Sequence, residues 1–430
     1  MVRKRYCAAI VAVVSSAALV LAGCSQSSQQ EASSDSAGGV EIKLSGDYNP
    51  LERDQIQDGG ELTLPIGEVT EQSNASHGNA VVDTNTLWYW YNPQLMLADG
   101  DGTPHPNPAY LTNVSAEEVD GKTVVTYDLN PDAVFNDGTA FDWHVFENTW
   151  KMSNGENPDV SINATDGYDL IESVTAGESD KQVVVTFKQP YPWWQALFSV
   201  PLHPAVADAQ TFNEGYLKNP HPEWGSGPYK VDQFDYNSGT VSFVPNEKWW
   251  GEKPKLDKVT YRRMELQAAI NAFQSGEIDA TVVSDKDRLA VAKSLKDVNI
   301  QGTLQPTHWV LTANSKAPNL ADVKVREALF TGINRETLAQ IRFNGLGYKE
   351  NLPGSFVMFQ NQKGYEDNFG SVVSYDQDKA KQLLDDAGWA EGSDGIREKD
   401  GKKLTLRYVT FGDDNQGKSM AAATQKMLKD

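Results

Sequence analysis

Three carboxylates lie close together along the chain, and closely spaced acids are the groups that general acid–base hydrolysis uses. Asp137 precedes a glycine, Asp142 precedes an apolar helical pattern, and Glu147 follows shortly after it. A turn accounts for Asp137, a helix N-cap for Asp142 and a solvated helix face for Glu147, so none of them requires a reaction. We therefore predict no catalytic residue and no enzymatic activity, with a hydrolase as the weaker alternative.

Histidines are the other residues that could do chemistry, and their spacing is not that of a metal site. The chain has no HExxH motif, and it lacks a CxxC pair, a Walker loop and a G-x-S-x-G elbow. Isolated histidines are ordinarily structural or exposed, so we predict no metal and no cofactor. The six histidines are His77, His105, His144, His203, His221 and His308.

Composition limits the classes of partner. The formal net charge is −21 at pH 7, and an acidic surface repels phosphates and gains no counterion release, which argues against nucleic acid. Acidity keeps an exported protein soluble, while a preference for cationic ligands is a weaker interpretation. A chain of 430 residues with 39% apolar content can bury a sizeable core, and its length favours two or three lobes.

The N-terminus has the pattern of a bacterial secretion signal. Basic residues precede an apolar run over about residues 6–20, and Leu21-Ala22-Gly23 leads to Cys24. The run is too short to span a membrane comfortably. This leader, residues 1–23, resembles a lipobox, which implies cleavage before Cys24, a lipid on its sulfur and tethering to the outer face of the cytoplasmic membrane. Residues 24–58 lack apolar periodicity and are expected to form a flexible tether.

Apolar periodicity predicts how the rest of the chain is built. Alternation predicts strands, and spacings of three and four predict helices. We expect strands over residues 61–67, 122–129, 182–187, 229–234, 240–244, 259–263, 278–283, 304–314 and 404–409. We expect helices after the caps Asp142 and Asn334, over residues 268–276, 322–333 and 375–388, and at the C-terminal end.

Several short motifs occur in an order and spacing that carry a family resemblance. Gly225-Ser-Gly-Pro-Tyr-Lys forms a turn, a strand pair follows it, and residues 246–251 and 253–262 come after that pair. Next come a helix ending in Ser-Gly-Glu-Ile-Asp at 275–279 and the string ADVKVREALFTGINRETL at 321–338. Together these stretches resemble the peptide-type (family 5) extracellular solute-binding proteins of ABC importers.

This resemblance implies an α/β, two-lobed, periplasmic-binding-protein-like fold of class II with an extra subdomain. Lobe I is expected to comprise residues 59–88 and 201–308, and the extra subdomain residues 89–200. Residues 309–430 are expected to form lobe II. Because family members continue further, we expect this lobe to be incomplete and the chain to be truncated at its C-terminus, with residues 404–409 as an unpaired strand edge.

The resemblance also implies where a ligand would bind. The loop after the first strand is expected to face the ligand, with Asn74, His77 and Asn79 as polar contacts. Residues 304–314 are expected to cross between the lobes, which makes His308 and Trp309 candidate contacts. Aromatic walls suit a cleft that accepts varied side chains, so Trp193 and Trp194 are further candidates, although most aromatic residues pack in cores.

The function implied is capture and release without covalent chemistry. An extended oligopeptide would pair its main chain with strand edges between the lobes, and closure would present it to ABC permease subunits in the membrane. The protein is expected to act as a monomer. A solute-binding protein for another ligand, such as an oligosaccharide, remains the alternative, because aromatic platforms would serve it equally well.

Overall fold

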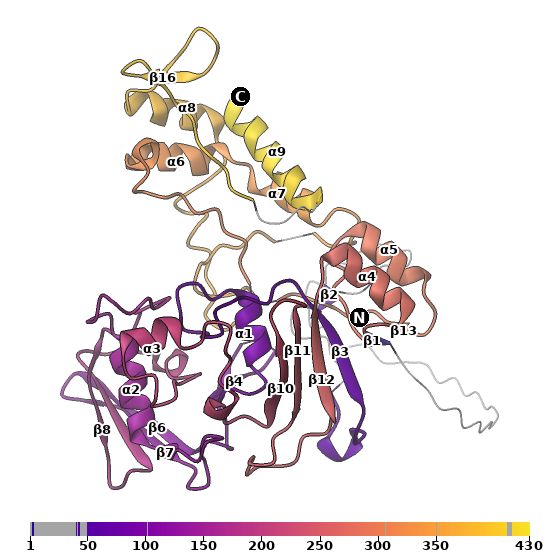
Figure 1. Cartoon of the computed structure of the whole chain (residues 1–430). Coiled ribbons are helices and arrows are strands. Elements are labelled where there is room, and N and C mark those ends of the chain that lie inside the picture. Colours follow the sequence, from indigo (N-terminus) through magenta and orange to yellow (C-terminus); the bar gives the residue numbers. More distant parts are fainter. Residues whose placement is uncertain are drawn as a thin grey trace, which may run out of the picture. The chain divides into compact units, whose positions relative to one another are not determined.

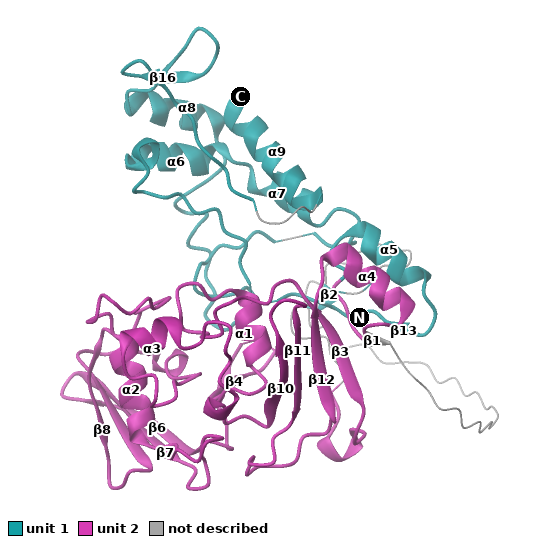
Figure 2. Ribbon diagram, in the orientation of Figure 1, with its two compact units in different colours: residues 1–47, 283–430 teal, residues 48–282 magenta. Residues whose placement is uncertain are grey.

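The computed structural model describes residues 2–3, 40, 42–43, 50–100, 102–305, 307–349, 351–410 and 415–430. Apart from Val2 and Arg3, the predicted leader lies outside the described residues, as does Cys24. The chain forms two compact units (Figure 2): unit 1 comprises Met1–Asp47 and Val283–Asp430, and unit 2 comprises Tyr48–Val282. The lobe boundaries predicted at residues 89, 201 and 309 stay predictions.

Unit 2 contains a four-stranded sheet built from both ends of its sequence (Figure 1). Strand β12 (Lys258–Arg263) pairs in parallel with β3 (Glu61–Ile66), and on its other side it pairs antiparallel with β11 (Thr240–Pro245). Strand β10 (Tyr229–Asp235) completes the order β10-β11-β12-β3. Helix α1 (Val82–Trp88) contributes Leu87 and Trp88 to the apolar core of this sheet.

A second four-stranded sheet in unit 2 is antiparallel throughout, in the order β6-β7-β9-β8. Its strands are β6 (Leu111–Val119), β7 (Lys122–Leu129), β8 (Ile171–Ala176) and β9 (Gln182–Phe187). Helix α2 (Trp143–Ser153) buries Val145 and Phe146 in the core of this sheet. The alternation in β7 and β9 buries every second side chain, as the sequence predicted.

Shorter elements fill the rest of unit 2. They are η1 (Arg53–Gln55), β4 (Met96–Ala98), β5 (Pro104–Pro106), η2 (Trp194–Ala196), α3 (Ala209–Glu214), η3 (Pro222–Trp224) and α4 (Leu266–Ser275). Helix α4 ends at Gly276, whose φ of 82° is the left-handed conformation that glycine adopts most readily. This confirms the predicted helix stop.

Unit 1 is built mainly from helices in its described part. Helix α6 (Val323–Gly332) packs against α8 (Gln377–Asp386), and α7 (Arg335–Arg342) packs against α9 (Asn415–Lys429) (Figure 1). Helix α5 (Lys286–Ser294) and η4 (Pro318–Leu320) precede them. The short strands are β1 (Val2–Arg3), β2 (Ile42–Lys43), β13 (Val298–Asn299), β14 (Gly302–Thr303), β15 (Ala390–Glu391), β16 (Arg397–Lys399) and β17 (Lys402–Lys403).

The predicted helix caps Asp142 and Asn334 are confirmed, and the structure adds Asp322 as the cap of α6. The side chain of Asp142 accepts a hydrogen bond from the main-chain N–H of His144, and Asp322 accepts one from Lys324. Asn334 accepts one from Thr337 at the start of α7. Each cap satisfies a main-chain donor that has no partner within the first turn of its helix.

Three predicted strands are wrong, because residues 278–283, 304–314 and 404–409 form no strand. Next to β3, a side chain takes the place of a ladder bond: the carboxylate of Asp279 accepts from the N–H of Thr63, while the N–H of Asp279 donates to the Thr63 carbonyl. Pairing ends one residue after β14 and β17. The N–H of Leu304 donates to the Lys43 carbonyl in β2 and that of Leu404 to the Arg397 carbonyl in β16, and the described residues after them up to 314 and 409 belong to no strand. Alternation alone does not supply the partner that a strand requires.

No helix among the described residues is long and apolar enough to cross a membrane.

Candidate functional site

The loop after β3 is anchored inside unit 2 by buried polar side chains. Asn74 is 2% exposed, and its amide donates to the Phe212 carbonyl in α3 while its oxygen accepts from the N–H of Ser76. Gln72 is also buried and donates to the Asn213 carbonyl. One hydrogen bond of the Asn74 side chain therefore holds the loop on α3 and the other braces the loop internally, and the predicted ligand contact of Asn74 stays a prediction.

The next two predicted contacts differ in exposure. His77 is buried, its ring stacks on Phe212 with centroids 6.0 Å apart, and its Nδ1 accepts from the N–H of Asn79 at 3.0 Å. Burial lowers the pKa of His77, so the neutral imidazole is favoured. The Asn79 residue is exposed. Of the three polar residues predicted in this loop, Asn79 is the one whose side chain is open to solvent.

The two adjacent tryptophans after β9 have different environments. Trp193 is 54% exposed, immediately before η2. Trp194 packs against the core of the second sheet and meets Tyr127 edge to face, with ring centroids 6.3 Å apart. Trp194 therefore has the core role that most aromatic residues take, whereas Trp193 presents apolar surface to solvent.

Residues 308 and 309 in unit 1 contact different groups. The His308 ring stacks with Phe359 at 4.4 Å and with Phe356 at 6.2 Å between centroids. The Trp309 ring is 67% exposed, and the guanidinium of Arg342 lies 4.7 Å from its centroid. The predicted pair thus consists of a histidine stacked against phenylalanines and a tryptophan held by an arginine.

Arg342, Phe356 and Phe359 were not predicted from the sequence as part of a site. Arg342 lies in the last turn of α7, where a basic residue is usually explained by the helix dipole. The two phenylalanines lie in an irregular stretch between α7 and α8. The signal that could have found them is a cluster of apolar residues without helical or strand periodicity, such as Phe356-Val357-Met358-Phe359.

The carboxylates that could have suggested hydrolysis are occupied by structural contacts. Asp137 accepts from the N–H of Thr139 in a turn, Asp142 caps α2, and Glu147 pairs with Lys151 at 2.7 Å one helical turn away. Within the described ranges, no group of three or more His, Cys, Asp or Glu residues could hold a metal ion. These contacts are the turn, cap and helix-face roles that the sequence predicted.

A cluster of rings and carboxylates joins two distant turns of unit 2. His203 is buried, stacks on Trp224 and lies with Nε2 3.2 Å from Oδ2 of Asp137. His221 also stacks on Trp224, at 3.5 Å between centroids, and its Nδ1 lies 2.7 Å from Oε1 of Glu223.

Burial lowers the pKa of His203, although Asp137 and Glu223 act in the opposite direction. Hydrogen bonds from Thr139 and the proximity of His203 outweigh burial and lower the pKa of Asp137.

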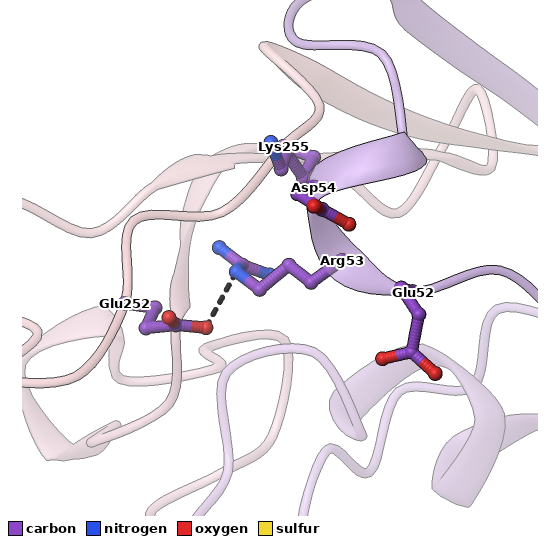
Figure 3. Close-up of a pocket in the computed structure, with 5 residues that line it drawn as sticks. All are labelled: Glu52, Arg53, Asp54, Glu252 and Lys255. Carbon is purple, nitrogen blue, oxygen red and sulfur yellow. Dashed lines mark ion pairs between the residues drawn. The ribbon is translucent and has the colours of Figure 1, made fainter.

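Two surface depressions of unit 2 are lined by residues other than the predicted contacts. One, of about 540 Å³, is lined by Glu52, Arg53, Asp54, Glu252 and Lys255 (Figure 3). Within it Arg53 pairs with Glu252 at 2.5 Å. Another, of about 320 Å³, is lined by residues between Pro245 and Pro254. The ion pair in the first depression, together with that between Lys255 and Asp58, fastens the chain before β3 to the connection between β11 and β12.

Comparison with known proteins finds consistent relatives. Residues 104–430 match the family described as bacterial extracellular solute-binding proteins, family 5 Middle. The oligopeptide-binding protein OppA of Mycobacterium tuberculosis (strain H37Rv) is 33% identical over 424 residues, covering 96% of this chain and 70% of that protein.

Solved structures share the fold. A periplasmic EDTA-binding protein, EppA, superposes with a TM-score of 0.68 and 26% identity, covering 91% of this chain and 73% of that one. The oligopeptide-binding protein AppA of Bacillus subtilis, in complex with a nonapeptide, gives a TM-score of 0.63 at 23% identity, covering 87% and 73% of the two chains. The predicted fold class, α/β with the two-lobed architecture of periplasmic binding proteins, is confirmed.

Proposed function

The chain belongs to the family 5 bacterial extracellular solute-binding proteins, and from this membership we propose that it captures oligopeptides and delivers them to the permease subunits of an ABC importer. Members of this family are solute-binding proteins rather than enzymes, and they work outside the cytoplasm. The observation that carries the proposal is the 33% identity to an oligopeptide-binding protein along 96% of the chain.

Among the predicted contacts, exposure separates two roles. We propose that Asn79, Trp193 and Trp309, which are exposed, touch the ligand directly. Buried or packed residues would instead shape the surfaces that present these three. Those residues are Asn74, His77, Trp194 and His308. Aromatic side chains with exposed faces suit a ligand whose side chains vary, since every apolar group gains from contact with a flat ring.

The ligand class can be tested by titration calorimetry on the purified 430-residue chain. We expect heat of binding from a mixture of short peptides and none from a mixture of oligosaccharides. Recovery of the peptides unchanged in mass after incubation would support capture without hydrolysis. Binding of oligosaccharides in place of peptides would contradict the proposal and favour the alternative ligand class.

The name of one structural neighbour, an EDTA-binding protein, shows that this fold also accommodates ligands that are not peptides. Titration with a metal–EDTA chelate is therefore a necessary third arm. If the chelate binds while peptides at the same concentration give no heat, the peptide proposal would be replaced by one for small anionic chelates.

Attachment to the membrane is a separate proposal. The residues around Cys24 fit a lipoprotein signal, and we propose that its sulfur carries the lipid that holds the protein on the outer face of the cytoplasmic membrane. Expression in a bacterial host with a radiolabelled fatty acid should label the wild-type chain and leave Cys24→Ala unlabelled. Equal labelling of both chains would refute attachment at Cys24.

A further inference from the structure

We propose that Arg342 is a positioning residue that holds the ring of Trp309 as a binding platform selective for neutral aromatic or aliphatic side chains over cationic ones. The inference rests on the proposed function, because it names the kind of peptide side chain that this platform would accept. It starts from the cation–π contact between the Arg342 guanidinium and the Trp309 ring, at 4.7 Å.

The first step is that Trp309 lies on a segment without regular structure. Residues 307–313 form neither helix nor strand, and the Trp309 residue is 67% exposed. An indole in such a segment has several accessible rotamers unless a contact selects one of them. The guanidinium over its ring provides that contact.

The second step is that Arg342 is itself fixed from several directions. It lies in the last turn of α7, and its Nη1 donates to the Ser284 carbonyl at 3.0 Å and to Oε1 of Gln416 at 2.6 Å. The side-chain amide of Gln416 in turn donates to the main-chain carbonyl of Arg342. The planar guanidinium therefore has its plane set by Gln416 in α9 and by Ser284, two residues before α5, so it can orient a ring stacked on it.

The third step is that the neighbouring side chain is engaged elsewhere. His308 stacks with Phe359 and Phe356, at 4.4 Å and 6.2 Å between centroids. Phe356 and Val357 are themselves 80% and 68% exposed, so apolar surface continues beside this stack. In unit 1, the cluster of His308, Phe356 and Phe359 is thus joined to Trp309 through the chain, and we call these four residues the aromatic shelf.

The charge of Arg342 determines what this shelf accepts. A tryptophan face attracts cations through its negative quadrupole, but a cation already lies against this ring. A second cation on the free face of the ring would be repelled by the guanidinium on the other face. A neutral apolar group suffers no such repulsion. Although the net charge of −21 attracts cations at long range, the local charge at this shelf disfavours them.

The test is a comparison of two peptide series on four proteins. The first series places a single Phe at each position of an alanine pentapeptide in turn, and the second series places a single Lys there. Calorimetry gives the Kd of every peptide. At one position or more, we expect the wild-type chain to bind the Phe peptide roughly tenfold more tightly than the Lys peptide. Arg342→Met should reduce that ratio at least about fivefold, and Trp309→Ala should abolish it.

The matched control is Arg407→Met, which removes the same charge from an exposed arginine of unit 1 and should leave the ratio unchanged. A ratio unchanged in Arg342→Met would overturn the assignment of Arg342, and one unchanged in Trp309→Ala would overturn the platform. If Arg407→Met lowered the ratio as much as Arg342→Met, net charge rather than position would be responsible, which also contradicts the inference.

A ligand-independent measurement separates this inference from the proposed function. With 5-fluorotryptophan incorporated, the fluorine resonance that disappears in Trp309→Phe identifies Trp309. We expect this resonance to shift and broaden in Arg342→Met and in Gln416→Leu, which frees the guanidinium without removing it. An unchanged resonance in both variants would overturn positioning by Arg342. Failure of the wild-type chain to bind any peptide would contradict the proposed function and the selectivity, while the resonance would still decide positioning.

Should Arg342→Met fail to fold, Arg342→Lys serves in its place. Lysine keeps the positive charge but lacks the planar fork that contacts Ser284 and Gln416. We expect the preference for Phe over Lys peptides to persist while the Trp309 resonance broadens. A sharp, unshifted resonance in Arg342→Lys would show that the fork does not hold the ring.

Discussion

The imidazole of His203 stacks on the indole of Trp224, with ring centroids 5.4 Å apart and planes inclined by 8°. This contact joins the turn that contains Asp137 to η3, because Asp137 lies 3.2 Å from His203 and donates its N–H to the Glu223 carbonyl. Unit 2 thus carries a buried imidazole between a tryptophan and a carboxylate. Its protonation is therefore linked to the stability of the unit.

Acidification is expected to destabilise unit 2 through His203. Because burial holds the pKa of native His203 below 6.5, the unfolded chain binds more protons at this residue between the two pKa values. The contribution of His203 to the free energy of unfolding is thus fully present above pH 6.5. It should decrease as the pH falls below 6.5, by at most about 1.4 kcal/mol per pH unit.

Urea unfolding at pH 7.5, 6.5 and 5.5 tests this prediction. His203→Gln should reduce the dependence, leaving the part due to His77, and the exposed His105→Gln should retain it in full; identical slopes in all three proteins would refute it.

Removal of the Lys181 ammonium group is expected to loosen the loop between β7 and α2. Its Nζ donates to the carbonyls of Asn130, Ala133 and Phe141, at 3.3, 3.0 and 2.9 Å. Burial lowers the pKa of Lys181, but the nearby carboxylates of Asp142 and Asp132 act in the opposite direction. Lys181→Met deprives three carbonyls of a donor and should cost about 2–3 kcal/mol of unfolding free energy.

Denaturant unfolding followed by tryptophan fluorescence measures this cost. The control is Lys188→Met, since Lys188 makes one exposed bond, to the Asp169 carbonyl. That variant should lose less than about 0.5 kcal/mol. Equal losses in the two variants would show that the three carbonyls find other partners.

Asn74 and Asn79 are expected to respond differently to alanine substitution. Asn74→Ala removes an acceptor for Ser76 and a donor to Phe212 in a buried site, so unfolding should become easier by about 1–3 kcal/mol. Asn79→Ala changes an exposed side chain and should leave stability within about 0.5 kcal/mol. Any weakening of peptide binding by Asn79→Ala would then report a direct contact. Full wild-type affinity in that variant would remove Asn79 from the proposed site.

Sequence patterns predicted the elements whose determinants are local. The caps Asp142 and Asn334 need only the residues that follow them, and the stop at Gly276 needs only a left-handed residue. The same holds for β7, where alternation corresponds to one buried face. In these cases the partner groups lie within a few residues, so spacing alone identifies them.

The remaining features depend on residues that are distant in sequence. Nothing near His203 indicates that Asp137 and Trp224 will surround it, and nothing near Trp309 indicates Arg342. For the same reason, polar residues in the loop after β3 were predicted as ligand contacts although Asn74 is bonded to α3. Sequence alone identified plausible residue types, but not which of them the fold would bury.

The region after α4 shows how a side chain can replace a strand. Asp279 bonds both main-chain groups of Thr63, through its carboxylate at 2.8 Å and its N–H at 2.9 Å, along the edge strand β3. Asp279→Ala would leave the Thr63 N–H without this acceptor and should cost about 1–2 kcal/mol. Asp279→Asn keeps an oxygen acceptor and should lose less than half as much.

Hydrogen exchange of a peptide spanning residues 61–66 measures the effect at the strand itself. Faster exchange is expected in the alanine variant, and protection equal to wild type would show that β3 is held by its pairing with β12 alone.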